Sequence, residues 1–194
     1  MREEVLDLLA HIQDLEQLRD RRYLALLILS PMRREEVLGV QMQDIDITNK
    51  LIKVRQVVTF KGNIPVVDDP KTEAGRRIIP ISQVLLSLLE ISAEDLDNKA
   101  QYLVGSTDNP NIPVSQQTVK RMWERISKTI NVYGKTPHCT RHTYATFGQR
   151  AGIPEKTMQT IGGWADQDTL RNIYTHTQAE DIELARKQIE SMYS

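Results

Sequence analysis

The chain has 194 residues, 40% of them hydrophobic and 26% charged, which suits one domain with an ordinary apolar core. No window approaches 18 apolar residues, the acidic N-terminus is unlike a signal peptide, and the single cysteine, Cys139, excludes an internal disulfide. We therefore expect a cytoplasmic protein without a membrane partner, and the net charge of −1 argues mildly against a dedicated nucleic-acid-binding domain.

The N-terminal part of the chain has helical patterns. Apolar residues recur at helical spacing over residues 5–18, and a continuous apolar run follows at residues 23–30. A third, short helix is expected over about residues 32–40, because the pair Ser30–Pro31 is typical of a helix start. The unpaired N–H groups of such a start favour a nearby anion.

The middle of the chain has a β pattern. A β-rich segment over residues 51–60 is followed by a turn, a second strand over residues 64–68, a loop and a third strand over residues 76–81. Helical patterns then resume at residues 83–92, 115–130, 136–151, 154–161, 168–175 and 179–192. We therefore expect one α+β domain over residues 1–194, mainly α-helical, with a small three-stranded antiparallel sheet and a tail helix at about residues 179–193.

Positive charge is concentrated in one stretch. Residues 116–150 contain one acid, Glu124, and seven cations, which are Lys120, Arg121, Arg125, Lys128, Lys135, Arg141 and Arg150. A basic face of this kind can neutralise phosphates locally. Charge alone leaves an ordinary solvated helix equally open.

Five side chains with the chemistry to attack a phosphodiester are spread along the chain. They are Arg33, His138, Arg141, Trp164 and Tyr174. Guanidinium forks match phosphate oxygens, and a phenol can become a covalent nucleophile when a base takes its proton. Each residue alone is better explained as a surface ion pair or a core side chain, whereas the full set indicates DNA strand transfer.

Several short motifs carry a resemblance to one family. In chain order they are Arg33-Arg-Glu-Glu36-Val-Leu with Asp44-Ile-Asp46, Lys71-Thr72 before Arg76-Arg-Ile-Ile-Pro80, Thr136-Pro-His138-Cys-Thr-Arg141-His142-Thr, and Ile161-Gly-Gly163-Trp164 through Tyr174-Thr-His176. This set resembles the catalytic domain of the tyrosine recombinases, also called the phage integrase family, over nearly all of the chain. The resemblance implies the fold of that catalytic domain.

The resemblance also implies catalytic roles. Arg33 and Arg141 would clamp the nonbridging oxygens of the scissile phosphate, where charge grows in the transition state. Tyr174 would be the nucleophile that forms a 3′-phosphotyrosyl link, and Lys71 would give a proton to the leaving 5′ oxygen. The covalent link stores the bond energy, so the resemblance implies neither a metal nor any other cofactor.

Three more residues complete the implied catalytic set. Glu36 would orient neighbouring side chains rather than contact DNA, and His138 would exchange a proton with Tyr174 or a phosphate oxygen. Trp164 would donate its indole N–H to phosphate and pack against the helix of the nucleophile. The residues expected to bind DNA are Arg33, Lys71, Arg141, Lys120 and Arg121.

The implied activity is site-specific recombination or integration at double-stranded DNA attachment sites, by the integrase of a bacterial phage or mobile element. The protein would be monomeric when free, form a tetrameric synapse on DNA and be nucleoid-associated when acting. We expect a catalytic fragment without the N-terminal core-binding domain that such enzymes usually carry.

Three alternatives stay open. A type IB topoisomerase would use the same chemistry, and a DNA-binding regulator could keep a relic active site. A metal site is the third, since His138, Cys139, His142 and His176 are all ligand types. Zinc hydrolases with this histidine spacing place a glutamate beside the first histidine, however, and Cys139 stands there instead.

Overall fold

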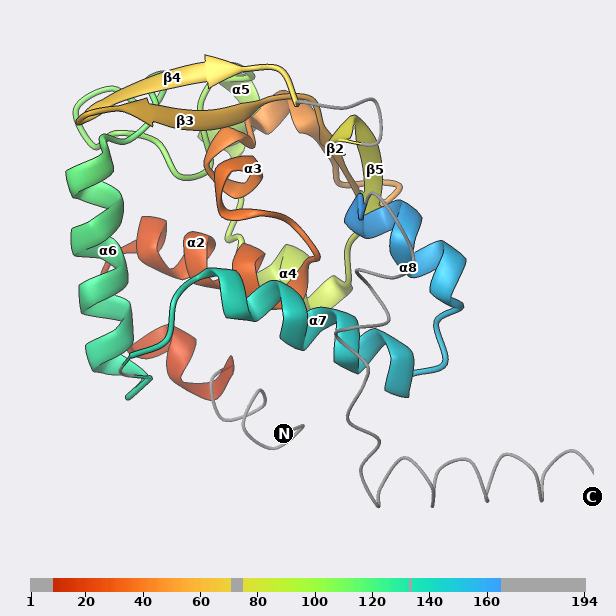
Figure 1. The fold of residues 1–194 in the computed structure, drawn as a ribbon. Coiled ribbons are helices and arrows are strands. Elements are labelled where there is room, and N and C mark those ends of the chain that lie inside the picture. The colour runs from red at the N-terminus through yellow and green to blue at the C-terminus, as the bar shows by residue number, and fades with distance from the viewer. Residues whose placement is uncertain (1–8, 71–74, 133, 165–194) are drawn as a thin grey trace, which may run out of the picture.

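The computed structural model describes residues 9–70, 75–132 and 134–164, and Figure 1 shows its arrangement. Its elements are, in order, η1 (His11–Asp14), α2 (Leu18–Leu29), α3 (Arg34–Gly39), η2 (Met42–Asp44), β1 (Ile45–Asp46), β2 (Leu51–Val54), β3 (Val57–Lys61), β4 (Ile64–Asp68), β5 (Arg77–Pro80), α4 (Gln83–Leu88), α5 (Ala93–Asp97), α6 (Gln116–Thr129), α7 (His138–Arg150) and α8 (Glu155–Gly162). The helices expected at residues 168–175 and 179–192 lie outside the described residues.

Helix α2 is the centre of the helical part. Residues 22–28 of α2 are all buried, as the apolar run predicted. Helices α3, α4, α6 and α7 all pack against α2 (Figure 1). A helix that is apolar on nearly every side needs such cover, because only burial on all faces removes its apolar surface from water.

Helix α6 forms for reasons visible in the sequence. The Ser115 side chain caps its N-terminus by accepting a hydrogen bond from the Thr118 backbone N–H at 3.2 Å. Val119, Met122 and Ile126 form its buried stripe. The predicted helix over residues 115–130 is therefore confirmed to within one residue at each end.

The strands form two small antiparallel sheets instead of one. One sheet has the order β1-β2-β5, and β3 and β4 form a separate hairpin. The expected strand over residues 51–60 is broken at Arg55–Gln56. There Arg55 forms an ion pair with the buried Asp44, and the Gln56 side chain donates to the Gly39 carbonyl at 2.9 Å. These contacts turn the chain so that β3 packs on α3.

Two predicted helix boundaries were wrong. The expected helix over residues 5–18 does not continue to Leu18, because η1 ends at Asp14 and the backbone is extended at Leu15 and Gln17. The Ser30–Pro31 pair does not start α3. Arg33 is the N-cap of that helix, whereas the Ser30 hydroxyl donates to the Leu26 carbonyl at 2.6 Å in the last turn of α2.

The apolar side chains form two clusters. The larger one joins α2, α3, α4, α6 and the β1-β2-β5 sheet, and the smaller one holds Ala145, Met158 and Trp164 between α7 and α8. Helix α8 packs against α7 through this smaller cluster, and it also contacts β5. Within the described ranges, no helix has the length and apolarity that a bilayer span requires.

Candidate active site

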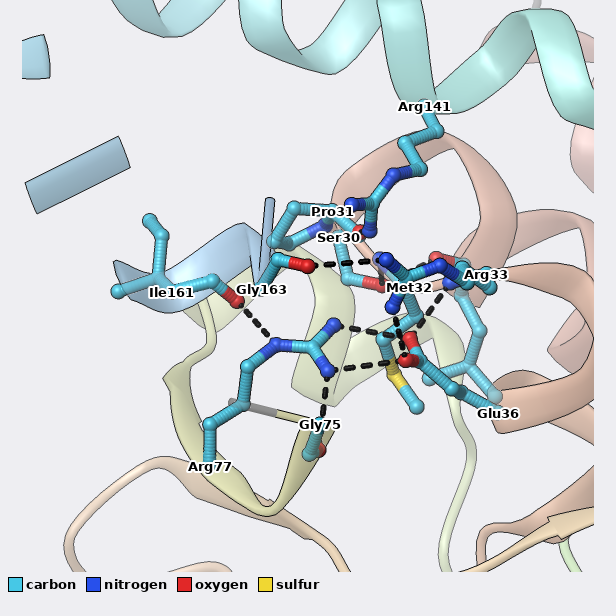
Figure 2. Close-up of polar contacts among 11 residues, drawn as sticks. Ser30, Pro31, Met32, Arg33, Glu36, Gly75, Arg77, Arg141, Ile161 and Gly163 are labelled. Carbon is cyan, nitrogen blue, oxygen red and sulfur yellow. Dashed lines mark hydrogen bonds and ion pairs between the residues drawn. The ribbon is translucent and has the colours of Figure 1, made fainter. Parts of the chain in front are cut away.

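Polar side chains from three separate segments and a backbone carbonyl from a fourth meet at the N-terminus of α3. Figure 2 shows the guanidinium groups of Arg33, Arg77 and Arg141 pointing toward one region around Glu36 and Gly163. Arg33 caps α3, Arg77 begins β5, Arg141 lies in the first turn of α7 and Gly163 follows α8. The fold thus brings together residues that lie as far as 130 positions apart in the sequence.

Glu36 is the anionic centre of this group. Its carboxylate is 2% exposed and accepts four hydrogen bonds, from the backbone N–H and Nη1 of Arg33 and from Nη1 and Nη2 of Arg77, at 2.7–2.9 Å. Burial alone would raise the pKa of Glu36, but the hydrogen bonds and charge of Arg77, followed by those of Arg33, outweigh it and lower the pKa. Glu36 is therefore a firmly ionised carboxylate that orients two arginines.

Arg33 is held at both ends of its guanidinium group. Nη1 donates to Glu36 Oε1 and Nη2 donates to the Gly163 carbonyl, both at 2.9 Å. Its side chain is nevertheless 42% exposed. An arginine with a fixed head and an open face can meet a phosphate oxygen without first losing much side-chain entropy.

The turn after α8 supplies that carbonyl. Gly163 lies in the left-handed region at φ 66°, which glycine adopts without steric cost, and its N–H donates to the Gln159 carbonyl at 2.8 Å. The turn directs the Gly163 carbonyl to Arg33 and the Ile161 carbonyl to Arg77. Two arginines thus occupy the C-terminal end of α8, where partial negative charge accumulates.

Arg141 is the buried member of the group, at 3% exposure. Its Nη1 donates to the Pro31 carbonyl, and its guanidinium carbon lies 4.0 Å from the centre of the Trp164 ring. Its Nη2 is buried and has no hydrogen-bond partner among the residues that the structure describes. Burial lowers the pKa of Arg141, and the nearby positive charge of Arg33 lowers it further, against the opposing effect of Glu36.

An arginine keeps its proton in proteins, so the unfavourable environment of Arg141 remains as a free-energy cost. Three guanidinium groups against one carboxylate leave two positive charges in excess at this site. A bound anion would satisfy the buried Nη2 and offset that excess. The charge of this group therefore suits an anion such as a phosphodiester.

The Trp164 ring packs against the Arg141 guanidinium. The ring is 6% exposed and packs so closely on Gly162 that a Cβ atom there would lie 1.6 Å from ring carbon Cζ3. The family resemblance implied that the Trp164 indole N–H donates to a phosphate. The contact that the structure describes is that of the ring with the Arg141 guanidinium, and the indole role stays a prediction.

The two histidines lie side by side on α7. The rings of His138 and His142 meet edge to face with centroids 4.9 Å apart, and both residues are exposed. Burial of its ring lowers the pKa of His142, and the charges of His138 and Arg141 add to this effect. Cys139 donates its thiol to the Thr136 carbonyl. Within the described residues, no three side chains of ligand type converge as a metal site would require.

The other predicted residues fall into two sets. Lys71, Tyr174 and His176 fall outside the described residues. Lys120 and Arg121 are exposed on α6, which Figure 1 shows at the end of the domain opposite α8. Their proposed DNA contacts are therefore separate from the arginine group and stay a prediction.

Arg77 was missed as a site residue. Its side chain is only 4% exposed and makes two parallel hydrogen bonds to Glu36. Strand alternation could have found it, because Arg77, Ile79 and Ile81 share the inward parity while Ile78 and Pro80 point outward. An inward arginine requires a buried acid as its partner.

Comparison with known proteins agrees with the motifs and the geometry. The model of the Phage integrase family matches residues 1–181. The chain belongs to the phage integrase family. Two relatives are the tyrosine recombinase XerC of Thermodesulfovibrio yellowstonii, 30% identical over 84% of this chain, and the transposase of transposon Tn916 from Enterococcus faecalis, 26% identical over 78%. These matches cover 52% and 40% of the two relatives, so the chain spans about half of their length or less.

Solved structures share the phage integrase catalytic-domain fold. The Tn1549 transposon integrase in complex with circular intermediate DNA superposes with a TM-score of 0.74 at 22% identity, over 99% of this chain and 66% of that one. The XerA recombinase superposes with a TM-score of 0.71 at 21% identity, over 97% and 62%. The predicted fold class is therefore confirmed, a mainly helical domain with a small antiparallel sheet.

Proposed function

We propose that this domain cleaves and rejoins DNA strands through a 3′-phosphotyrosyl intermediate, as the catalytic part of a site-specific recombinase. The observation that carries the proposal is the convergence of Arg33 and Arg141 beside the turn at Gly163, which precedes Tyr174 in the sequence. Arg141 brings a buried donor without a partner among the described residues, and Arg33 brings an exposed face. Membership of the phage integrase family supports the same chemistry.

In the proposed step, the phenolic oxygen of Tyr174 attacks the scissile phosphorus in line with the leaving 5′ oxygen. The bond from phosphorus to Tyr174 forms while the bond to the 5′ oxygen breaks. His138 or a phosphate oxygen takes the phenolic proton, and Lys71 supplies a proton to the leaving oxygen. Attack by another strand's 5′ hydroxyl then reverses these changes and joins new partners.

The arginines act on the charge that grows during this step. As phosphorus becomes five-coordinate, its nonbridging oxygens carry more charge, so fixed guanidinium groups bind the transition state more strongly than the ground state. Removing one such preorganised donor typically costs about 10²- to 10³-fold in rate. Glu36 contributes by holding the Arg33 head in place rather than by contact with DNA.

The substrates and assembly follow from this chemistry. We propose double-stranded attachment sites as the DNA partner and a tetramer of protomers on DNA, since two duplexes with two exchanging strands each need four active sites. The likeness to the Tn916 transposase and the Tn1549 integrase supports a mobile-element integrase. Action on chromosomal DNA would place the protein in the bacterial cytoplasm, at the nucleoid.

Covalent trapping tests the proposal. The chain is incubated at low salt, where phosphate contacts are strongest, with fragmented, randomly nicked genomic DNA of its source organism. Short fragments beside nicks diffuse away after cleavage, so a protein–DNA adduct that survives denaturant should accumulate. Sequencing the trapped ends gives the target site.

Three control measurements test the nucleophile and separate the alternatives. The Tyr174→Phe variant should bind the same DNA without forming an adduct, and trapping by this variant at the rate of the unsubstituted chain would refute Tyr174 as nucleophile. Relaxation of a supercoiled plasmid without a second site would indicate a topoisomerase instead. Sequence-specific binding without any cleavage would indicate a regulator.

A further inference from the structure

Arg77 has a set of contacts that the proposed chemistry does not yet use. Its Nη1 and Nη2 donate to the two oxygens of Glu36 at 2.9 and 2.8 Å, and its Nε donates to the Ile161 carbonyl at 2.8 Å. Nη1 also donates to the Gly75 carbonyl at 3.1 Å. One planar group thus joins α3, the start of β5 and the last turn of α8 (Figure 2).

The donors of Arg77 are already taken up by the protein, which sets this residue apart from Arg141. Both side chains are buried, but Nε, Nη1 and Nη2 of Arg77 all donate to residues of the domain, whereas Nη2 of Arg141 has no partner among the described residues. The positive charge of Arg77 is largely matched by Glu36, its bidentate partner. Any effect of Arg77 on a bound anion must therefore pass through its neighbours.

Two short routes lead from Arg77 to the arginines that face the anion. Through Glu36 it reaches Arg33, because the same carboxylate accepts from both residues. Through the turn after α8 it reaches both arginines, because Gly163 accepts from Arg33 and the next residue, Trp164, lies under Arg141. Both routes lie within the described residues.

We propose that Arg77 is a positioning residue for the anion site, by which we mean the region that the Arg33 and Arg141 guanidinium groups line. Arg77 shares Glu36 with Arg33, and it fixes the end of α8, whose following turn contacts Arg33 and Arg141. Without Arg77, the whole charge of Glu36 acts on Arg33, so the Arg33 guanidinium forms an ion pair with Glu36 alone and turns away from the anion. The last turn of α8 loses its bond to Arg77 of β5 at the same time. A lysine cannot replace Arg77, because an ammonium group cannot make two parallel bonds to Glu36 and a third to Ile161.

A purely structural ion pair is the rival explanation, and the chain offers a matched control. Arg22 is also buried, at 8% exposure of its side chain, and donates to the carbonyls of Leu89 and Glu90 and to the Asp95 carboxylate. Arg22→Gln should therefore destabilise the fold in the same way as Arg77→Gln. Only the Arg77 variant should affect the anion site.

The first measurement uses inorganic phosphate and needs no DNA. Titration of the whole chain is followed by ¹⁵N NMR of the arginine Nε–H groups of Arg33 and Arg141. We expect Arg77→Gln and Arg77→Lys to weaken phosphate binding about 10- to 100-fold, the scale of losing an outer partner of a functional group. Arg22→Gln should change it less than about twofold, a free-energy change of less than roughly 0.4 kcal/mol.

A double substitution keeps the test decisive if the single variant folds poorly. Glu36→Gln combined with Arg77→Gln removes one charge of each sign. Its loss of phosphate affinity should be smaller than the product of the two single-variant losses, because the route through Glu36 is already broken in Glu36→Gln. Equal phosphate affinity in Arg77→Gln and Arg22→Gln would overturn the proposal. Additive losses in the double variant, or a lack of phosphate response in the unsubstituted chain, would overturn it as well.

That Arg77 positions a catalytic clamp rests on the proposed function. Covalent trapping distinguishes a failure of the positioning role from a failure of the proposed function. If phosphate binding depends on Arg77 but no DNA adduct forms, the proposed function fails and the positioning role stands. If adducts form at equal rates in Arg77→Gln and Arg22→Gln, the recombinase proposal stands and the positioning role fails.

Discussion

Glu36→Gln should destabilise the folded chain far more than a surface substitution on the same helix. The carboxylate accepts four hydrogen bonds from two arginines and is 2% exposed. A glutamine presents one oxygen, so its NH2 group would face donors that previously met the second oxygen. It also leaves Arg33 and Arg77 without the negative charge between them.

The expected loss in the free energy of unfolding follows from these buried contacts of Glu36. Breaking a buried ion pair by removing one partner costs about 3–5 kcal/mol, because a charge stays buried without compensation. We therefore expect the free energy of unfolding to fall by roughly this amount at pH 7. Glu35 is the matched control, since it pairs with exposed Arg34 at the surface, and Glu35→Gln should cost at most about 1 kcal/mol.

Urea unfolding from pH 7 to pH 3 measures both the size and its pH dependence. The pKa of Glu36 in the folded chain lies below its ordinary value of 4.5, so its contribution is complete above that value and is lost as pH falls through the folded pKa. The gap between the unsubstituted chain and Glu36→Gln should therefore narrow in acid. A gap at pH 7 no larger than that of Glu35→Gln, or one unchanged at pH 3, would refute this reasoning.

Two further substitutions test the support of Arg141. Gly162→Ala should lower the free energy of unfolding by about 1–3 kcal/mol, because its Cβ would lie 1.6 Å from a rigid Trp164 ring atom. Gly148→Ala is the control and should cost less, because the nearest atom to its Cβ is at the flexible end of Met158. Equal losses in thermal or urea unfolding would contradict the close packing of the ring. Arg141→Lys should lower the rate of adduct formation by about 10²-fold or more at saturating DNA, because a lysine replaces the fork by a point charge; a rate within about threefold of the unsubstituted chain would contradict the clamp.

Local patterns predicted the elements whose stability is local. Helix α6 has its cap and its apolar stripe within a few residues of each other, so its bounds could be read from the sequence. The apolar run of α2 likewise predicted a helix that is buried on most sides. The motifs around Arg33, Arg141 and Trp164 also indicated a common site, since the resemblance to the family carried the long-range information that periodicity lacks.

The errors lie where distant contacts decide the local structure. The strand over residues 51–60 breaks because Arg55 pairs with Asp44 and Gln56 donates to Gly39, and these partners lie more than ten residues away. The error at Ser30 is of another kind, because its hydroxyl donates to the carbonyl of Leu26, only four residues back in α2. Arg77 was passed over because its partner Glu36 is 41 residues away, although strand alternation placed it inward.

Peptide mapping of the trapped adduct tests the central claim most directly. After nuclease and protease digestion, mass spectrometry should find a residual 3′-linked nucleotide on the peptide that contains Tyr174, with a free 5′ hydroxyl on the released strand. A nucleotide on any other residue, or a 5′-linked phosphate, would contradict the account.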